Sequence, residues 1–147
     1  MDIPSLLGCF NARRVDYVVV GALAMPPHGY FRASRDIDLF IRPTRDNADR
    51  TLAALADAGY DVTDLTPETL QTRKVLFRQY ALRTDIHPMV LGAEYEGVAA
   101  RSVSTSIGGV PTRAAGLDDL IAMKEAAGRP KDLEDLKALR RLRERQG

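Results

Sequence analysis

Apolar residues recur every three or four positions in several segments, a spacing typical of helices that pack through one face. On this pattern we expect helices over residues 4–14, 44–58, 117–126 and 131–145, and a turn with a short helix over 65–72. Thr44 can cap the second of these helices, and Gly59 can end it. The tetrapeptide 22–25 suits one or two helical turns that stop at Pro26.

Short β-branched and aromatic runs lie between these segments and predict strands. We expect strands over residues 15–20, 36–41, 60–62, 74–79 and 81–86, a loop over 28–35, and a hairpin formed by 101–107 and 110–113. The order of elements predicts an α/β (α+β) fold: a small mixed sheet with helices packed on one face and two helices at the C-terminal end. A length of 147 residues fits one domain over 1–147.

The composition excludes several kinds of site and partner. One cysteine and two histidines exclude an internal disulfide and a structural metal site held by His and Cys. No apolar run has the length of a membrane span and the N-terminus lacks signal-peptide character, so we expect a cytoplasmic protein without a membrane partner. The net charge of +1 gives no general field for nucleic acid. Most basic residues are arginines. Two explanations of this excess are open: a bias of the genome towards arginine codons, or a role of arginine in phosphate recognition.

The candidate chemistry lies in the predicted strand 36–41. Asp36 and Asp38 share one face of that strand, about 7 Å apart at their backbones. Adjacent carboxylates repel each other unless water or a cation neutralises them, and hard oxygen ligands suit Mg²⁺. The alternative is that both acids lie on the solvent-facing side of an edge strand. Asp85, on a later predicted strand, is a third acid that could lie across the sheet from the pair.

The stretch 17–41 resembles the nucleotidyltransferase superfamily of the DNA polymerase beta type. Its signature is Gly-Gly or Gly-Ser at the start of a short helix, followed by an acid-hydrophobic-acid pair on the next strand. The sequence offers Gly21-Ala22-Leu23-Ala24, Gly29, and Arg32-Ala33-Ser34-Arg35-Asp36-Ile37-Asp38-Leu39. Within the superfamily, the likeness is to the small prokaryotic branch of minimal nucleotidyltransferases and AbiEii-type toxins, and the tail 117–136 is also similar to that branch.

The resemblance implies roles for individual residues. Asp36, Asp38 and Asp85 would be catalytic and would bind two Mg²⁺ ions, with Mn²⁺ as an alternative, and Asp85 would activate the acceptor hydroxyl. The implied nucleotide-binding residues are Gly21, Ala22, Arg32, Ser34, Arg35 and Lys124. Lys124 has a second interpretation, a salt bridge to Asp132 or Asp135.

The implied reaction is Mg²⁺-dependent transfer of a nucleoside monophosphate from a nucleoside triphosphate to an acceptor hydroxyl on an RNA 3′ end, a protein or a small molecule. A toxin–antitoxin setting would add a cognate toxin or antitoxin protein as a partner. Ala22 departs from the family pattern, because it lacks the hydroxyl or the backbone freedom of that position but keeps its amide. The alternative function is therefore a catalytically degenerate nucleotide- or partner-binding module, antitoxin-like, with the same fold.

The two histidines and the C-terminal arginines indicate a function less strongly than the three acids do. We expect His28 on the surface, with a phosphate contact as the alternative. For His87 we expect a backbone partner at a strand end, with tuning of Asp85 as the alternative. The basic run 140–145 suits a solvated helix end, and contact with RNA is its other interpretation.

Overall fold

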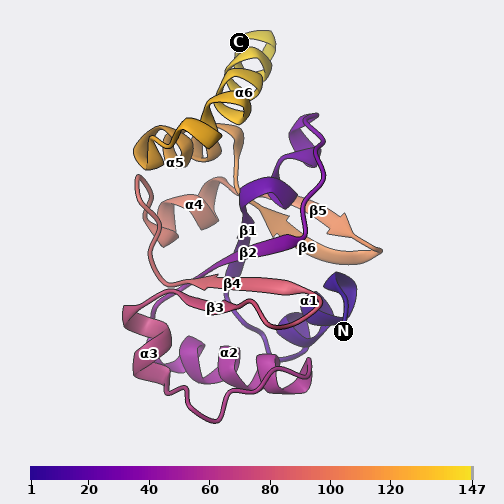
Figure 1. The fold of residues 1–147 in the computed structure, drawn as a ribbon, viewed down its shortest axis with the longest axis vertical. Coiled ribbons are helices and arrows are strands. Elements are labelled where there is room, and N and C mark those ends of the chain that lie inside the picture. The colour runs from indigo at the N-terminus through magenta and orange to yellow at the C-terminus, as the bar shows by residue number, and fades with distance from the viewer. Residues whose placement is uncertain (147) are drawn as a thin grey trace.

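A mixed sheet of six strands forms the centre of the computed structural model, which describes residues 1–146 (Figure 1). The strands are β1 (Tyr17–Val20), β2 (Asp36–Ile41), β3 (Val75–Phe77), β4 (Arg83–His87), β5 (Val103–Ile107) and β6 (Val110–Ala114). They lie in the order β3-β4-β2-β1-β6-β5. The β2–β4 and β1–β6 pairs are parallel and the other three pairs are antiparallel. The mixed α/β class expected from the sequence is confirmed.

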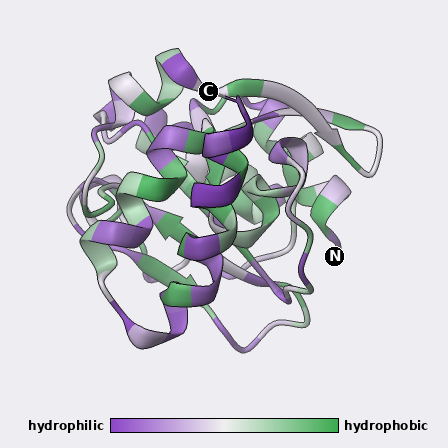
Figure 2. Ribbon diagram, turned by 90° about the horizontal axis from the view of Figure 1, so that it is seen from above, coloured by the Kyte–Doolittle hydropathy of each residue, from purple (hydrophilic) through white to green (hydrophobic). Residues whose placement is uncertain are grey.

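Helices lie on both sides of this sheet and not on one face as expected, with α2 and α3 below it in Figure 1 and α4, α5 and α6 above it, because Tyr95 of α4 packs against Phe40 on the face that carries the acids. The α-helices are α1 (Ile3–Ala12), α2 (Arg45–Asp57), α3 (Pro67–Thr72), α4 (Tyr95–Arg101), α5 (Leu117–Ala127) and α6 (Leu133–Gln146). Three short 3₁₀ turns are η1 (Gly21–Ala24), η2 (Pro26–His28) and η3 (Pro130–Asp132). Hydrophobic and hydrophilic residues alternate along the helices (Figure 2), as expected where one helix face is buried.

Strand β2 separates the core from the polar face of the sheet. Ile37, Leu39 and Ile41 are fully buried, whereas Asp36 and Asp38 between them are partly exposed. Because strand side chains alternate between faces, the three apolar residues belong to one face and the two acids to the other. Tyr17, paired with Ile41, packs edge-on against Phe10 of α1, so α1 covers the apolar face.

Helix α4 was not expected from the sequence. It has seven residues and contains Gly97, so its helical pattern is short and its propensity low. Tertiary contacts compensate, because the Tyr95 ring packs edge-on against Phe40 at 5.4 Å and Arg42 lies over the same ring. Arg42 also binds Glu96 at 2.6 Å. The first turn of α4 is therefore fixed to the end of β2, on the face that carries Asp36 and Asp38.

The strand expected over 60–62 is wrong, since these residues are irregular. The buried Tyr60 hydroxyl hydrogen-bonds Thr84 at 2.6 Å, and its ring packs against Phe77 and Tyr80. The Asp61 carboxylate accepts a hydrogen bond from the Thr63 amide at 3.0 Å. This contact stabilises a turn, so these residues do not pair with a neighbouring strand. The strands expected over 74–79 and 81–86 shorten to β3 and β4. Across residues 1–146 no helix has both the length and the hydropathy needed to cross a membrane.

Candidate active site

Strand register places the three predicted acids on one face of the sheet. Asp38 pairs directly with Asp85 across the parallel β2–β4 ladder, and Asp36 pairs with Arg83. Directly paired residues share a face of a sheet, so Asp38 and Asp85 face the same side. Asp36 is two residues away on that face. On this face of β2, the first buried residue after the acids is Phe40, where helix α4 covers the sheet.

Gly21 gives Asp38 the space that it occupies. Gly21 directly follows β1, and its φ of +71° lies in the left-handed region that favours glycine. A Cβ atom built at this position would lie 2.5 Å from Asp38 Oδ2. The glycine predicted to let backbone approach a phosphate therefore also lets backbone approach a carboxylate of the site.

Each carboxylate has a basic neighbour. His87 Nε2 lies 2.8 Å from Asp38 Oδ1, and the Arg78 guanidinium donates to Asp85 Oδ2 at 2.7 Å. Arg83 Nε lies 2.9 Å from Asp36 Oδ1, an ion pair without hydrogen-bond geometry. Arg78 also reaches Asp36 Oδ2, at 3.8 Å. The charges of Asp36 and Asp85 are thus offset by Arg78 and Arg83 of the same chain.

Asp85 is the most enclosed of the three acids. Its side chain is 5% exposed, against 25% for Asp38 and 31% for Asp36. Burial raises the pKa of the Asp85 carboxyl above its usual value, and the nearby charge of Asp38 raises it further, while Arg78 acts in the opposite sense. Asp85 Oδ1 is buried with no hydrogen-bond partner among the described residues. A buried carboxylate oxygen without a donor is costly, and a bound cation would satisfy it.

Three side chains of this face could hold a metal ion together. One ligand atom from each of Asp38, Asp85 and His87 lies within 4.8 Å of the others. Two carboxylates, one of them with an unpartnered oxygen, match the hard oxygen donors that divalent cations prefer. The residues present therefore fit a divalent ion. Asp36 lies outside this group of three, beside Arg83 and Arg78, and its role as a metal ligand stays a prediction.

His87 is the site residue that sequence reasoning did not assign. It was expected to have a backbone partner, but its Nε2 atom instead contacts the Asp38 carboxylate, so that expectation is wrong. The signal was its position two residues after Asp85 on the same strand, which places both side chains on one face. The sequence suggested that Asp85 could lie across the sheet from Asp38, but only the β2–β4 register shows that His87 reaches Asp38.

The loop before β2 positions some of the predicted phosphate-binding residues. The Ser34 hydroxyl donates to the Asp36 carbonyl oxygen at 3.0 Å and fixes the start of the strand. Arg32 Nε lies 3.0 Å from Asp135 Oδ1 of α6, whereas Arg35 is exposed. Ala22 is buried within η1. Their roles in nucleotide binding stay predictions.

Lys124 lies in a buried ion-pair cluster between α5 and α6. Its Nζ atom is 3.1 Å from Asp132 Oδ1 and 3.2 Å from Asp135 Oδ2, so both expected salt-bridge partners are present. Arg129 binds Asp132 as well, and hydrogen bonds from Arg129 lower the pKa of Asp132 to about 2. The charge of Asp38 also contributes to a raised pKa of Arg129, which places the cluster within electrostatic range of the carboxylates.

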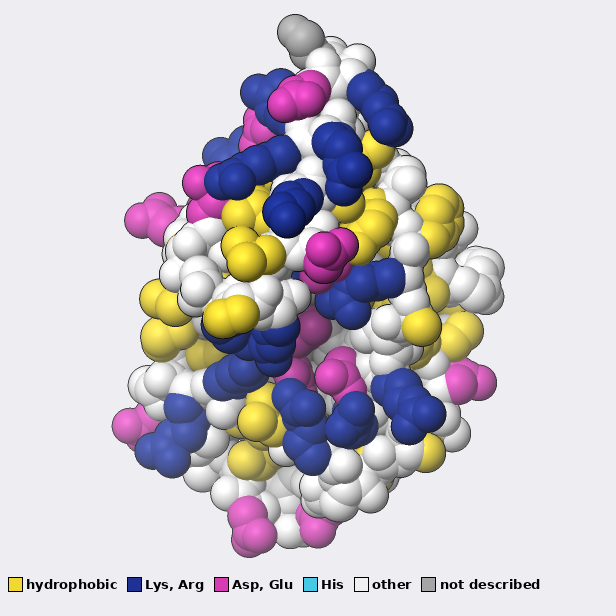
Figure 3. Space-filling model, turned by 45° about the horizontal axis from the view of Figure 1, so that its top comes forward, with side chains coloured by type: hydrophobic (Ala, Val, Ile, Leu, Met, Phe, Trp, Pro, Cys, Tyr) yellow, Lys and Arg dark blue, Asp and Glu magenta, His cyan; other side chains and the backbone are white. Residues whose placement is uncertain are grey.

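One face of the molecule carries both acidic and basic side chains. Figure 3 shows acidic side chains in a hollow, with lysine and arginine side chains above and below them. Negative groups framed by positive ones suit a ligand that carries both metal ions and phosphates, because the acids attract the metal and the bases attract the phosphate oxygens.

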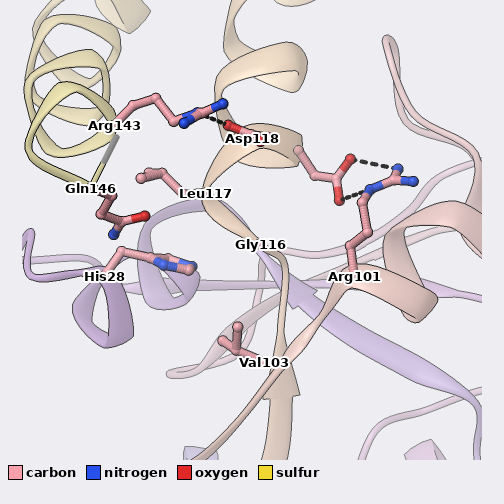
Figure 4. A pocket seen from close by; sticks show the side chains of 9 residues that line it. His28, Arg101, Val103, Gly116, Leu117, Asp118, Arg143 and Gln146 are labelled. Atoms are coloured by element: carbon pink, nitrogen blue, oxygen red, sulfur yellow. Dashed lines mark hydrogen bonds and ion pairs between the residues drawn. The ribbon is translucent and has the colours of Figure 1, made fainter.

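A separate pocket of about 370 Å³ lies at the start of α5 (Figure 4). It is lined by His28, Arg101, Val103, Gly116, Leu117, Asp118, Asp119, Arg143 and Gln146. Arg101 forms two hydrogen bonds with Asp119, and Arg143 binds Asp118. His28 Nε2 lies 2.8 Å from the Ala115 carbonyl oxygen, so this residue is tied to the fold and not simply at the surface. The arginines of this pocket are thus already paired, and none of the three predicted acids lines it.

No curated protein matches the chain. A model of the family described as "Nucleotidyl transferase of unknown function (DUF2204)" matches residues 1–147, the whole sequence. The family agrees with the site, since carboxylates that share one face of a mixed sheet are the arrangement expected for metal-assisted nucleotidyl transfer. The chain therefore belongs to the DUF2204 family of nucleotidyl transferases.

Proposed function

We propose that the chain transfers a nucleoside monophosphate from a nucleoside triphosphate to an acceptor hydroxyl and releases pyrophosphate. The observation that carries this proposal is the direct pairing of Asp38 with Asp85, whose Oδ1 atom is buried and unpartnered. Together with Asp36 these residues would hold Mg²⁺, with Mn²⁺ as the alternative. The ions, when bound, supply positive charge that stabilises the attacking and leaving oxygens.

The chain's own residues account for the remaining chemistry. A bond forms between the acceptor oxygen and the α-phosphorus, and the bond from that phosphorus to the β-phosphate oxygen breaks. The proton of the acceptor hydroxyl would pass to the Asp85 carboxylate, which lies on the same face of the sheet as Asp38. The backbone at Gly21 and Ala22, together with Ser34, Arg32, Arg35 and Lys124, would orient the triphosphate.

Calorimetric titration with each nucleoside triphosphate, with and without Mg²⁺, tests the binding step. We expect Mg²⁺-dependent binding that weakens by at least about tenfold in Asp38→Asn, because one ligand of the ion is lost. Asp64→Asn is the matched control, since Asp64 is an exposed acid outside the site. Equal binding by the wild type and Asp38→Asn would contradict the proposed site.

A second candidate function is a binding module that has lost turnover. The observation that favours it is Ala22, a buried alanine in η1 where the family pattern has Gly or Ser. A pyrophosphate-release assay separates the two candidates once binding has been established. Release that stops in Asp38→Asn supports the enzyme, and nucleotide binding without release supports the module.

The acceptor and the biological setting belong to the same proposal. We infer a member of the small prokaryotic branch that includes AbiEii-type toxins, on the residue likeness in 17–41 and 117–136. An RNA 3′ end, a protein or a small molecule would supply the hydroxyl, and a cognate toxin or antitoxin would be the partner. Growth arrest on expression of the wild type, absent with Asp38→Asn, would support a toxin. Equal growth with both would argue against it.

A further inference from the structure

His87 contributes the only nitrogen atom to the group of three that could hold a metal ion. Its Nε2 atom, Asp38 and Asp85 each offer one ligand atom within 4.8 Å of the others. The His87 side chain is 13% exposed and lies at the end of β4, where strand pairing fixes its backbone. The imidazole is therefore held in the site and does not have to be recruited from a loop.

The distance between His87 and Asp38 suits two ligands of one ion. Nε2 and Asp38 Oδ1 are 2.8 Å apart. Two ligands at about 2.1 Å from an octahedral ion and at right angles to each other are about 3 Å apart. The separation of these two atoms is therefore close to that of two adjacent ligands of one ion.

The nature of the donor atoms bears on which metal is preferred. Mg²⁺ takes oxygen ligands almost exclusively and keeps several waters, whereas imidazole nitrogen suits transition metals. Two carboxylates and one imidazole form a mixed set. Mn²⁺ tolerates such a set and still favours the oxygens that a triphosphate would add.

We propose that His87 Nε2 ligates the divalent ion of this site and that this nitrogen makes the site select Mn²⁺ over Mg²⁺. The proposal rests on the proposed function, since it concerns the same carboxylates. It adds a ligand that the resemblance to known nucleotidyltransferases did not supply, and it names the metal.

The chain has two histidines, His28 and His87, so two single variants are enough to assign a histidine nitrogen bound to the ion. Mn²⁺ bound to the protein is examined by electron spin echo envelope modulation, which detects imidazole ¹⁴N coordinated to the ion. We expect nitrogen modulation in the wild type and in His28→Asn, and its absence in His87→Asn. Titration by electron paramagnetic resonance gives the affinities. Mn²⁺ binding should weaken by at least about tenfold in His87→Asn, while Mg²⁺ binding, measured by competition, changes much less.

A second measurement covers the case in which His87→Asn fails to fold. Wild-type protein labelled with ¹⁵N-histidine should replace the ¹⁴N pattern with a ¹⁵N pattern, and this needs no variant at position 87. Mn²⁺ bound without histidine nitrogen, or nitrogen modulation retained in His87→Asn, overturns this inference and leaves the proposed function intact. Failure of the wild type to bind either Mn²⁺ or Mg²⁺ overturns both.

Discussion

Gly21 and Asp38 depend on each other at the scale of single residues. Gly21→Ala would place a methyl group 2.5 Å from Asp38 Oδ2 and would force φ near +71° on a residue with a Cβ atom. We expect a loss of about 1–2 kcal/mol of unfolding free energy from the backbone alone. Because the Asp38 carboxylate must move, metal binding should also be lost. Urea denaturation and a Mn²⁺ titration measure the two effects.

Gly109→Ala is the control for this prediction. Gly109 has a similar φ of +82°, but a Cβ atom there would meet nothing within 4 Å. The control should lose comparable stability and retain metal binding. If Gly21→Ala binds Mn²⁺ as well as Gly109→Ala does, the close approach to Asp38 has no consequence for the site.

Arg78 contacts carboxylates that the proposed metal ion would also contact. It donates to Asp85 Oδ2 and lies near Asp36, yet its own side chain is 44% exposed. Arg78→Gln removes this cation, so we expect Mn²⁺ to bind about fivefold more tightly, which corresponds to about 1 kcal/mol. Arg45→Gln, which breaks a surface pair with Asp49, is the control and should leave the affinity unchanged. Weaker binding by Arg78→Gln would mean that Arg78 supports the site.

At the scale of elements, the ion-pair cluster around Lys124 joins α5 to α6. Lys124→Met would remove one cationic partner from Asp132 and from Asp135, whose side chains are only 4% and 6% exposed, and would leave each of them one arginine partner. Because charged hydrogen bonds are lost but neither carboxylate is left without a cation, we expect a loss of about 1.5–3 kcal/mol of unfolding free energy in urea denaturation. Lys137→Met changes an exposed lysine of α6 and should have little effect. Equal stability of the two variants would show that the cluster is not needed for the packing of these helices.

Elements with a strong local pattern could be predicted from the sequence, and those made by distant contacts could not. Helix α2 begins after Thr44 and ends before Gly59, both of which are visible locally. Helix α4 depends on the contact of Tyr95 with Phe40, 55 positions earlier in the sequence. Because no local pattern encodes such a contact, single-sequence reasoning missed this helix.

The same distinction holds for the site. Asp36 and Asp38 were evident because the alternation within one strand places them together. The partners of the acids were not evident, because His87 and Arg83 reach them through the parallel register of β2 with β4, and Arg78 reaches them from the turn after β3. Strand register depends on the packing of the whole sheet, and no residue near Asp38 in the sequence specifies it.

At the scale of the whole molecule, acid should weaken the fold partly through Asp132. Its pKa is lowered to about 2 from an ordinary value of 3.8, so it contributes stability above pH 3.8. That contribution is lost as the pH falls through about 2. Asp132→Asn should therefore be less stable than the wild type at pH 7 and pH 5, and the difference should shrink below about pH 4.

Urea denaturation across this pH range measures the difference. The control is Asp118→Asn, since Asp118 is 65% exposed beside Arg143. It should change stability by less than about 0.5 kcal/mol at every pH. A difference for Asp132→Asn that stays constant from pH 7 to pH 2.5 would contradict the assigned pKa.

The alternation of side chains in strand β2 restricts the insertions and deletions that the gene can accept. Its six residues carry the acids on one face and the core on the other. Deletion or insertion of one codon within 36–41 would exchange the two faces and turn Ile37 and Leu39 towards the ligand. Changes of length are therefore restricted to the neighbouring segments, above all to the loop of residues 29–35, which ends where the acids begin. A longer or shorter loop there would leave the alternation of acids and core residues in the strand unchanged.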